Sequence, residues 1–394
     1  MAGRAARIGH VGRRVLRSGI CLGVVACVAF AAPAASAENL PEAMAKAYQT
    51  NPQLNAERAR QRATDENVPQ ALAGYRPQIV ASLSAGLQSV RNLLPDNTFQ
   101  SAGLKPWTIG VTVTQILFNG FKTANSVRVA ELQVQSGREA LRNVGQGVLL
   151  DAVTAYSNVL ANQTLVDAQR ANVAFLQETL GITQKRLNAG DVTPTDTAQA
   201  EARLSRGRAD LNAAEVNLAI SQATYTQVIG NPPAQLRPAE AADRYLPRSR
   251  EDATGLAFRE HPAVMAATFD VDVASTSIRV AESSLMPTIT LQGNASRSRD
   301  ADPSLTTFAT DQASVTGQLT QPIYDGGTAA SQTRQAKEVA VQSRQVLDQV
   351  RNQARTAAVG AWVTNEGAKI AVAASESEVR AATVALAGVQ KEVA

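Results

Sequence analysis

The sequence carries the same pattern twice, and this duplication restricts the folds that it can adopt. The segment 114–121 (TQILFNGF) recurs as 320–327 (TQPIYDGG), an offset of 206 residues, and the residues around Pro77 recur around Pro287, an offset of 210. Solenoid repeats run to only about 20–50 residues. Each copy is therefore a unit of several elements, and two such units are expected to lie side by side about a pseudo-symmetry axis.

The first 37 residues have the features of a secretory signal peptide. Five arginines precede an apolar run at 20–32, and residues 35–37 (ASA) form a small-residue cleavage site. The mature chain is expected to begin at Glu38. Cys21 and Cys27 both lie in the signal, so the mature chain is expected to have no disulfide or thiol chemistry. Lipoprotein processing at Cys27 stays open as an alternative, although the residues before it match a lipobox poorly.

Without this segment the basic charge of the chain disappears. Lys plus Arg fall from 38 to 33, against 34 Asp plus Glu, so the mature net charge is about −1. Charge therefore gives no reason to expect a nucleic-acid partner. No later apolar run reaches the roughly 20 residues that a transmembrane helix needs, so any entry into a membrane would use strands.

Few residues with catalytic chemistry remain in the mature chain. His261 is its only histidine, and it stands beside a proline at the position that Asn51 holds in the first copy, which predicts a helix boundary. Without cysteines or clustered histidines there is no basis for a zinc, haem or iron–sulfur site, and a Ser-His-Asp triad would depend on His261 alone. No Gly-rich phosphate loop is present. The sequence argues against an enzyme and predicts neither a cofactor nor a metal.

Segments of each copy alternate between apolar and polar residues with a period of two, which predicts strands. The segment 78–88 and a run from Trp107 form a predicted hairpin over 78–118, with a loop at 92–105, and the second copy has a predicted hairpin over 288–323. The apolar parity of the first strand comprises Ile79, Ala81, Leu83, Ala85 and Leu87. Strands of about ten residues with apolar and polar faces suit a transmembrane barrel, but also a half-buried soluble sheet. Four strands are too few for a barrel, which needs about eight, so they pack on another element or several chains share one barrel.

The segment between the hairpins is predicted to be a long helical hairpin over 122–229. A helix from Lys122 to about Leu187 would be on the order of 100 Å long, and its apolar spacing of three, four and seven suits a coiled-coil seam. Residues 191–196 are expected to form the turn, and 197–229 the return helix. Upstream, 40–74 is predicted helical, with breaks at Asn51-Pro52 and near Pro69.

These elements define a predicted domain organisation. The first repeat covers 38–230, a Pro- and charge-rich linker covers 231–250, and the second repeat covers 251–394 with a long helix over 327–394. Ala394 falls opposite the end of the first long helix. The second repeat is therefore expected to be truncated before its hairpin tip.

Two motifs resemble those of the TolC family of outer-membrane channels, over residues 39–394. The first resembles the family's strand-to-helix junction and the second its helical-hairpin tip. The junction residues are Gln115, Phe118, Asn119 and Gly120 in the first copy and Gln321, Pro322, Tyr324, Asp325 and Gly326 in the second. The tip residues are Asn188, Ala189, Gly190, Asp191, Val192 and Asp196. Glycine permits the sharp bend from strand to helix, and Asn or Asp can cap the new helix.

The resemblance implies an α+β membrane protein that assembles as a homotrimer. Each chain would contribute four strands to a shared 12-stranded barrel surrounded by outer-membrane lipid, and long coiled-coil helices to a tunnel through the periplasm. The hairpin tip would dock on a periplasmic adaptor driven by an inner-membrane pump of RND or ABC type, for drug efflux or type I protein secretion. In the family, acidic residues near the second tip narrow the pore. Asp196 matches that motif position in the first copy, and its counterpart would lie beyond Ala394.

Two other functions fit parts of the sequence. A periplasmic adaptor also has a signal and a helical hairpin, but it would not duplicate two ten-residue β-hairpins at a fixed offset. A secreted coiled-coil scaffold would have the helices without entering a membrane. Charged residues placed on the strand face that carries Ile79 and Leu83 would separate these possibilities. They would prevent insertion into the outer membrane only if that face contacts lipid.

Overall fold

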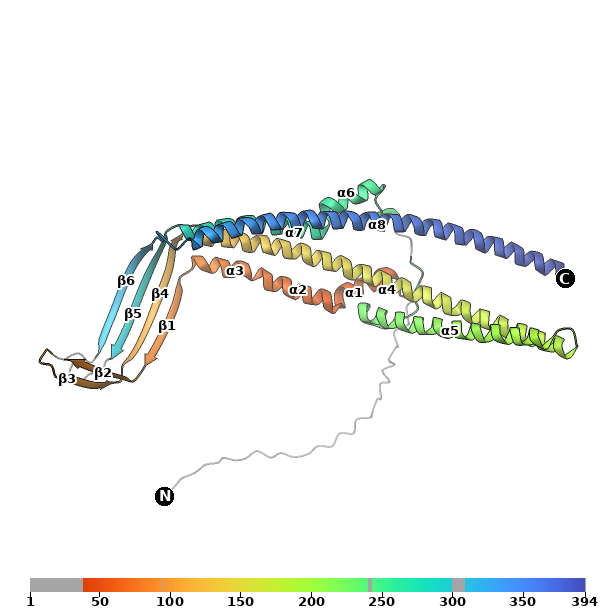
Figure 1. Ribbon diagram of the computed structural model, residues 1–394, viewed down its shortest axis with the longest axis horizontal. Coiled ribbons are helices and arrows are strands. Elements are labelled where there is room, and N and C mark those ends of the chain that lie inside the picture. Colours follow the sequence, from red (N-terminus) through yellow and green to blue (C-terminus); the bar gives the residue numbers. More distant parts are fainter. Residues whose placement is uncertain (1–37, 94, 240–242, 300–308, 394) are drawn as a thin grey trace, which may run out of the picture.

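The computed structural model describes residues 38–93, 95–239, 243–299 and 309–393. The predicted signal peptide, with Cys27, and the predicted polar loop of the second hairpin at 300–304 lie outside these residues. The molecule is elongated, with a β-sheet at one end that is bent away from a long shaft of helices (Figure 1).

The main sheet contains four antiparallel strands in the order β1-β4-β5-β6. Its strands are β1 (Gln78–Ala85), β4 (Trp107–Asn119), β5 (Thr288–Arg299) and β6 (Thr310–Thr320). Gln78 pairs with Thr114 in the first hairpin, and Thr288 pairs with Thr320 in the second. These pairs are related by the two repeat offsets of the sequence, so both hairpins have the same register. The period-two pattern therefore predicted these four strands correctly.

The loop predicted at 92–105 was wrong in part, because a further hairpin occupies most of it. The strands β2 (Gln88–Leu93) and β3 (Phe99–Leu104) pair with each other in a small separate sheet. Asp96 organises their turn, since its Oδ1 accepts hydrogen bonds from the Thr98 amide at 3.0 Å and hydroxyl at 2.6 Å. Such turn residues are typical of hairpins as well as of open loops. The described residues thus contain six strands rather than the four expected.

Three short helices lead from Glu38 to the sheet. They are α1 (Leu40–Thr50), α2 (Pro52–Asp65) and α3 (Asn67–Leu72), followed by the 3-10 turn η1 (Ala73–Tyr75). The predicted break at Asn51-Pro52 is confirmed, and Asn51 Oδ1 caps α2 by accepting from the Gln53 amide at 2.9 Å. The second break, predicted near Pro69, occurs three residues earlier at Glu66, because proline is tolerated in the first turn of α3.

The long helical hairpin consists of α4 (Lys122–Asn188) and α5 (Pro194–Ile229). α5 begins inside the turn predicted at 191–196, because Pro194 occupies its first position, where the fixed φ of proline suits a helix. α4 packs against α5 over one part of its length and against α7 over another. Its buried apolar residues include Leu132, Val134, Val148, Val159 and Val166. Predicted seam residues are thus buried, although Leu165 remains exposed.

The second copy forms the opposite side of the shaft (Figure 1). The linker contains the 3-10 turn η2 (Asp243–Tyr245), and the helical part of the second copy comprises α6 (Arg250–Glu260), α7 (Pro262–Glu282), the 3-10 turn η3 (Ser283–Leu285) and α8 (Thr328–Val393). His261 occupies a helix boundary, as predicted: its Nδ1 accepts from the Ala263 amide at 3.2 Å and caps α7. α7 packs against both α4 and α8 and so joins the two copies.

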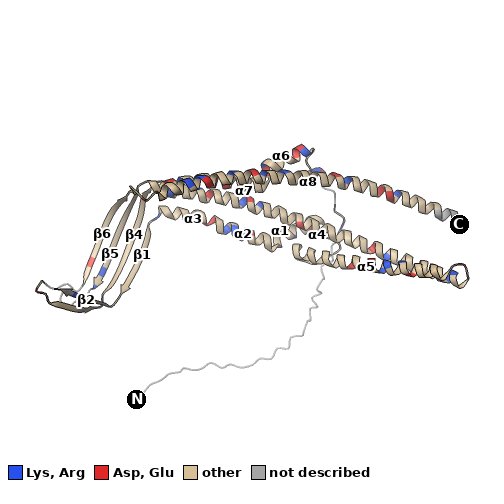
Figure 2. Cartoon of the chain, in the orientation of Figure 1, with Lys and Arg blue, Asp and Glu red and all other residues tan. Residues whose placement is uncertain are grey.

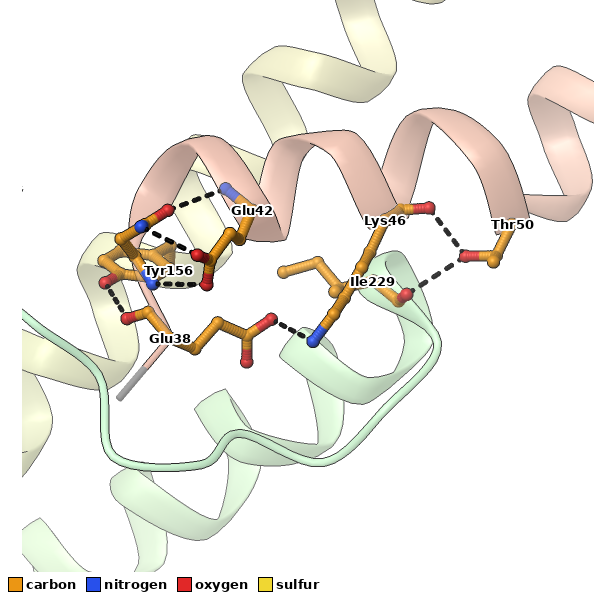
Figure 3. Close-up of polar contacts among 7 residues, drawn as sticks. Glu38, Glu42, Lys46, Thr50, Tyr156 and Ile229 are labelled. Atoms are coloured by element: carbon orange, nitrogen blue, oxygen red, sulfur yellow. Dashed lines mark hydrogen bonds and ion pairs between the residues drawn. The ribbon is translucent and has the colours of Figure 1, made fainter. Parts of the chain in front are cut away.

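The largest core cluster lies where α1 meets α4 and α5, and its largest side chains are Tyr156 and Tyr225. Beside it is an assembly that we call the N-terminal clamp, which comprises Glu38, Lys46, Thr50, Tyr156 and the segment 235–237. Figure 3 shows the first four of these residues. Lys46 forms an ion pair with the buried carboxylate of Glu38 at 2.7 Å. The Tyr156 hydroxyl lies 2.9 Å from the Glu38 carbonyl and 2.6 Å from that of Arg237. The first residue of the predicted mature chain is therefore fixed to the helical hairpin and to the segment that follows it, which sequence reasoning missed.

Candidate functional site

The four-stranded sheet has one apolar and one polar face. Residues that pair across neighbouring strands lie on the same face, and Ile79, Val113, Gly293 and Val315 form one such row. The adjacent rows on this face add Leu83, Ile109, Ala81, Val111, Ala295, Ala313, Leu291 and Leu319. The opposite face carries Ser82, Ser84, Thr112, Thr114, Gln292, Asn294, Ser296, Gln312, Ser314, Thr316 and Gln318.

Within the parts of the chain that the structure describes, no element covers the apolar face. Ile79 is 66 % exposed, Leu83 is 73 % exposed and Val315 is 77 % exposed. In a soluble protein, an apolar surface of this extent marks an interaction site or a membrane contact. The half-buried soluble sheet that the strand pattern also allowed is thus not what the chain forms.

A β-bulge changes the direction of side chains near the end of β4. Ile116 pairs with Thr290, but Phe118 pairs with Ile289, so Leu117 is the extra residue. Counting by twos from Trp107 would put Phe118 on the polar face. The bulge moves it onto the apolar face beside Ile289, and its ring packs edge-on against Phe121 with centroids 5.4 Å apart. A bulge of this kind cannot be located from alternation alone.

The first strand-to-helix junction is held by two side-chain amides. Gln115 Nε2 donates to the carbonyl of Tyr75 at 3.2 Å and so ties the end of β4 to the segment before β1. Asn119 Oδ1 accepts from the amide of Thr123 at 3.3 Å, and its Nδ2 donates to the Thr123 hydroxyl at 2.7 Å. Gly120 has φ +62°, a left-handed conformation that glycine adopts without strain. These residues turn the chain sharply from strand into helix.

The second junction repeats these contacts. Gln321 Nε2 donates to the carbonyl of Leu285 at 3.2 Å, and Leu285 is the repeat counterpart of Tyr75. Asp325 caps α8, accepting from the amides of Gly327 at 2.9 Å and Ala329 at 2.7 Å. These bonds lower the pKa of the Asp325 carboxyl, and the bond from Ala329 has the largest effect. Asp325 lies beyond the end of β6. Gly326 takes φ +69°.

The two junctions differ in their surroundings. Gly120 lies against η3, and a Cβ at this position would fall 2.5 Å from the Cβ of Met286 and 2.8 Å from the Ser283 carbonyl. Around Gly326 no atom lies within 4 Å of such a Cβ. Pro322 and Tyr324 are also exposed, Tyr324 by 89 %. A pocket of about 600 Å³ separates the two junctions, and Asn119, Met286 and Pro322 contribute to its lining.

The hairpin tip lies at the end of the shaft farthest from the sheet (Figure 1). The amides of Ala189, Gly190 and Asp191 donate to the carbonyls of Lys185, Leu187 and Arg186, which closes the end of α4. Gly190 takes φ +83°. The predicted tip residues other than the half-buried Val192 are exposed: Asn188, Ala189, Gly190, Asp191 and Asp196.

Asp196 performs a structural task at this tip. Its Oδ2 accepts from the amide and the hydroxyl of Thr193, both at 2.8 Å, and forms a capping box at the start of α5. The hydrogen bond from the Thr193 amide lowers the pKa of the Asp196 carboxyl most, and the bond from the Thr193 hydroxyl lowers it further. Sequence reasoning assigned Asp196 to docking and missed the cap, although the spacing of Thr193 and Asp196 is a capping-box signal. Its part in docking stays a prediction.

Throughout the described ranges, His, Cys, Asp and Glu side chains do not gather in a group of three or more that could hold a metal ion. Among the helices that the structure describes, none is long and apolar enough to span a bilayer.

Comparison with known proteins identifies the family. A family model described as "Outer membrane efflux protein" matches residues 43–231 and 254–394, which is most of the chain. The chain belongs to the outer membrane efflux protein family. It is thus an outer-membrane export channel protein that extends into the periplasm, and neither a periplasmic adaptor nor a secreted scaffold.

Individual relatives agree with this assignment. The outer membrane efflux protein BepC of Brucella suis is 39 % identical over 365 residues, which cover 91 % of this chain and 76 % of BepC. The outer membrane protein TolC of Vibrio cholerae is 26 % identical over 318 residues, covering 79 % of this chain and 71 % of TolC. The solved structure of the channel protein CusC has a TM-score of 0.71 at 17 % identity, covering 85 % of this chain and 77 % of CusC, and so shares the fold.

Proposed function

We propose that three copies of this chain close one barrel and one helical tunnel, and so form the outer-membrane duct of a tripartite efflux or type I secretion system. The observation that carries this proposal is a sheet with an uncovered apolar face and two open edges, at β1 and β6. A membrane-spanning sheet has to close, because lipid offers no hydrogen-bond partner to an edge. Three copies would supply twelve strands. Such a duct needs neither a catalytic residue nor a cofactor, since a pump would supply the energy.

The duplication supports a particular way of closing the barrel. Within the chain, β4 of the first copy pairs with β5 of the second, with Val113 opposite Gly293. The equivalent contact between chains would join β6 to β1 of the neighbouring copy. Shifting each residue by its repeat offset places Leu319 opposite Leu83 of that copy. We also propose that 38–230 and 251–394 act as two structural repeats joined by the linker 231–250.

Disulfide cross-linking tests this register. The only native cysteines, Cys21 and Cys27, lie in the predicted signal, so Leu83→Cys combined with Leu319→Cys gives a defined pair. Paired residues have Cβ atoms about 4.5–5.5 Å apart, close enough to oxidise. Within one chain the two strands are three spacings apart, about 14 Å, so a bond can form only between chains. We expect covalent dimers and trimers on a non-reducing gel.

The matched control keeps Leu319→Cys and moves the second cysteine to Ser84, which lies on the polar face. This pair is expected to give monomers only. Monomers from the Leu83 and Leu319 pair in purified outer membranes would argue against the shared barrel. Equal cross-linking of both pairs would indicate random collisions in place of a defined register.

A second test asks which face meets lipid. Val315 lies on the apolar face of β6, midway along the strand, and the next residue, Thr316, lies on the polar face. Lys near the bilayer midplane costs about 2–4 kcal/mol on the lipid side of a barrel. Val315→Lys is therefore expected to remove the protein from the outer-membrane fraction, whereas Thr316→Lys is expected to leave its amount unchanged. Loss of Thr316→Lys from the outer-membrane fraction, with Val315→Lys retained, would show that the polar face contacts lipid.

We propose that the hairpin tip, Asn188 to Val192, docks on a periplasmic adaptor that is coupled to an inner-membrane pump of RND or ABC type. Its exposure and its distance from the sheet support this role. Gly190→Val would distort the tip, because Gly190 has φ +83°, while Gly181→Val places the same side chain in open space on α4. We expect cells with Gly190→Val to accumulate ethidium at unchanged outer-membrane levels of the protein. Accumulation equal to that of Gly181→Val would contradict docking at the tip.

A further inference from the structure

The main sheet carries very few charged residues, and they lie together. In β1, β4, β5 and β6 the charged residues are Arg297, Arg299 and Asp311. All three occur at the end of the sheet away from the helices, where Figure 2 shows blue on β5 and red on β6 within strands that are otherwise tan.

These side chains belong to the apolar face. Arg297 pairs with Ile109 on one side and with Asp311 on the other, and Arg299 pairs with Trp107. Arg297 and Asp311 form an ion pair, with Nε 3.2 Å from Oδ1, and both side chains are largely exposed. Charges on a lipid-facing surface are costly at the middle of the bilayer and nearly free of cost near its interfaces. Their position along the strand therefore decides what they can do.

Aromatic residues mark the two edges of the apolar band. Trp107 lies at the start of β4, at the level of Arg299, and Phe118 lies at the other end of the same strand. Arg299 is ten residues from Ile289 along β5, about 33 Å at 3.3 Å per residue. With the usual barrel tilt of about 40°, this becomes a height of about 25 Å, which equals the apolar band of outer-membrane barrels. Arg299 therefore lies at the level of lipid headgroups, and Arg297, about 5 Å in height nearer the middle of the bilayer, can reach them with its long side chain.

We propose that Arg297 and Arg299 bind the phosphate group of a membrane lipid whose acyl chains lie along the apolar face of β4 and β5. This inference rests on the proposed insertion of the sheet into the membrane. Residues two apart on one strand face are about 6.6 Å apart, so two guanidinium groups can approach one phosphate from both sides. The planar donors of arginine match phosphate oxygens in pairs. Trp107 supplies an amphipathic ring of the kind that sits at the headgroup level.

Quenching of Trp107 fluorescence tests the site directly. The chain has two tryptophans, Trp107 and Trp362, so Trp362→Phe leaves Trp107 as the sole reporter. The full chain is reconstituted in vesicles of dioleoylphosphatidylcholine that contain either brominated phosphatidic acid or brominated phosphatidylcholine. One arginine near an anionic headgroup contributes about fivefold in binding. We expect the mole fraction that gives half-maximal quenching to be about fivefold to tenfold lower for brominated phosphatidic acid than for brominated phosphatidylcholine. The preference ratio is the second of these mole fractions divided by the first.

The variants assign this preference to the two arginines. Arg297→Gln combined with Arg299→Gln is expected to reduce the ratio to about one, and Asp311→Asn is expected to increase it, because a competing carboxylate is removed. Arg334→Gln combined with Arg344→Gln removes two exposed arginines from α8 instead and is expected to keep the ratio of the parent.

Two results would overturn the inference. Equal quenching by the two brominated lipids in the parent, or a preference that survives the loss of both strand arginines, would show that these residues do not select phosphate. Absence of quenching by either lipid would place Trp107 outside the membrane and would reject the proposed insertion together with this inference.

Discussion

The two strand-to-helix junctions have the same local geometry but different neighbours. In both, a glutamine amide donates to a carbonyl before the preceding strand, and an Asn or Asp caps the helix four residues on. A Cβ added at Gly120 would clash with Met286 and Ser283 of the second copy, whereas a Cβ added at Gly326 would have no neighbour within 4 Å. The turn is thus encoded by the residues of each junction, while its packing is supplied by the neighbouring copy.

The long helices show the same difference. Tyr156 of α4 is fully buried against α1 and α5, whereas its counterpart Trp362 on α8 is only partly covered. The neighbour of the first copy is the second copy of the same chain. Under the proposed trimer, the neighbour of the second copy would be the first copy of another chain. Substituting a residue of the first copy therefore tests a contact that is made within the chain, whereas substituting its counterpart in the second copy tests a position that the chain leaves exposed.

The largest expected difference is at the two junction glycines. Gly120→Ala would add left-handed strain of about 1–2 kcal/mol and a clash with Met286 of about 1–3 kcal/mol, a loss of about 3 kcal/mol in the free energy of unfolding. Gly326→Ala in a monomer would add the strain alone. Urea unfolding of the detergent-solubilised protein, with its mass measured by light scattering, compares them. Equal losses in the free energy of unfolding in monomeric samples would contradict the difference between the two glycines. Losses that become equal on trimer formation would show that a neighbouring chain packs against Gly326.

A smaller difference is expected at the paired aromatic residues. Tyr156→Phe removes the hydroxyl that contacts Glu38 and Arg237 and leaves buried polar groups without this partner. The expected cost is about 2 kcal/mol. Trp362→Phe should cost about 0.5 kcal/mol, because Trp362 is partly exposed. Thermal unfolding followed by circular dichroism measures both, and a larger loss at Trp362 would show that α8 is already packed in the sample.

The helix caps are expected to differ less. Asn119 lies two residues before the N-cap position of α4, but its side chain accepts from the Thr123 amide in the first turn. Asn119→Ala should therefore cost about 1 kcal/mol, as loss of an N-cap side chain does. Asp325→Ala should lower the unfolding temperature further, because Asp325 accepts two backbone amides and Asn119 accepts one. Asp325→Asn keeps an acceptor and serves as the control. A larger effect at Asn119 would mean that packing in the first junction depends on its cap.

The smallest effect is a pH dependence that only one junction can have. The pKa of Asp325 is lowered by the amides of Ala329 and Gly327, so its contribution to stability is present above the ordinary value of 3.8 and is lost as the pH falls through the lower folded-state pKa. Asn119 does not titrate. Asp325→Asn should therefore flatten the pH dependence of the unfolding midpoint below pH 3.8, the ordinary pKa of this carboxyl, whereas Asn119→Asp should steepen it. An unchanged slope in both variants would show that the caps carry no linked proton.

Much of the architecture follows from periodicity, because strands and helices of this length repeat their pattern many times. The proline-free run after Lys122 predicted α4 to within a residue, whereas the alternation over 78–88 predicted the start of β1 but overran its end at Ala85 by three residues. Single-residue events have no such repetition. The bulge at Leu117 and the hairpin β2–β3 each depend on contacts across strands, so counting residues could not place them.

The candidate sites were predicted unevenly for a similar reason. The recurrence of Gln115 as Gln321 indicated a structural task, but its acceptor, the carbonyl of Tyr75, lies about 40 residues earlier and is found only in the folded chain. Thr193 and Asp196 carried a readable capping signal that went unused. The proposed lipid contact of Arg297 required the pairing of β4 with β5, because the sequence alone does not show that Arg297 lies beside Ile109.

The N-terminal clamp joins residues that are synthesised at very different times. Glu38 begins the predicted mature chain, and its backbone partners Gln235 and Arg237 follow about 200 residues later. At about 5–20 residues per second, the start of the chain waits some 10–40 s for them. Until then α1 can pack on α4, but Glu38 lacks its backbone partners. We therefore expect the clamp to close last in the first copy, and a protease present during export to cut near Glu38 before it cuts the shaft.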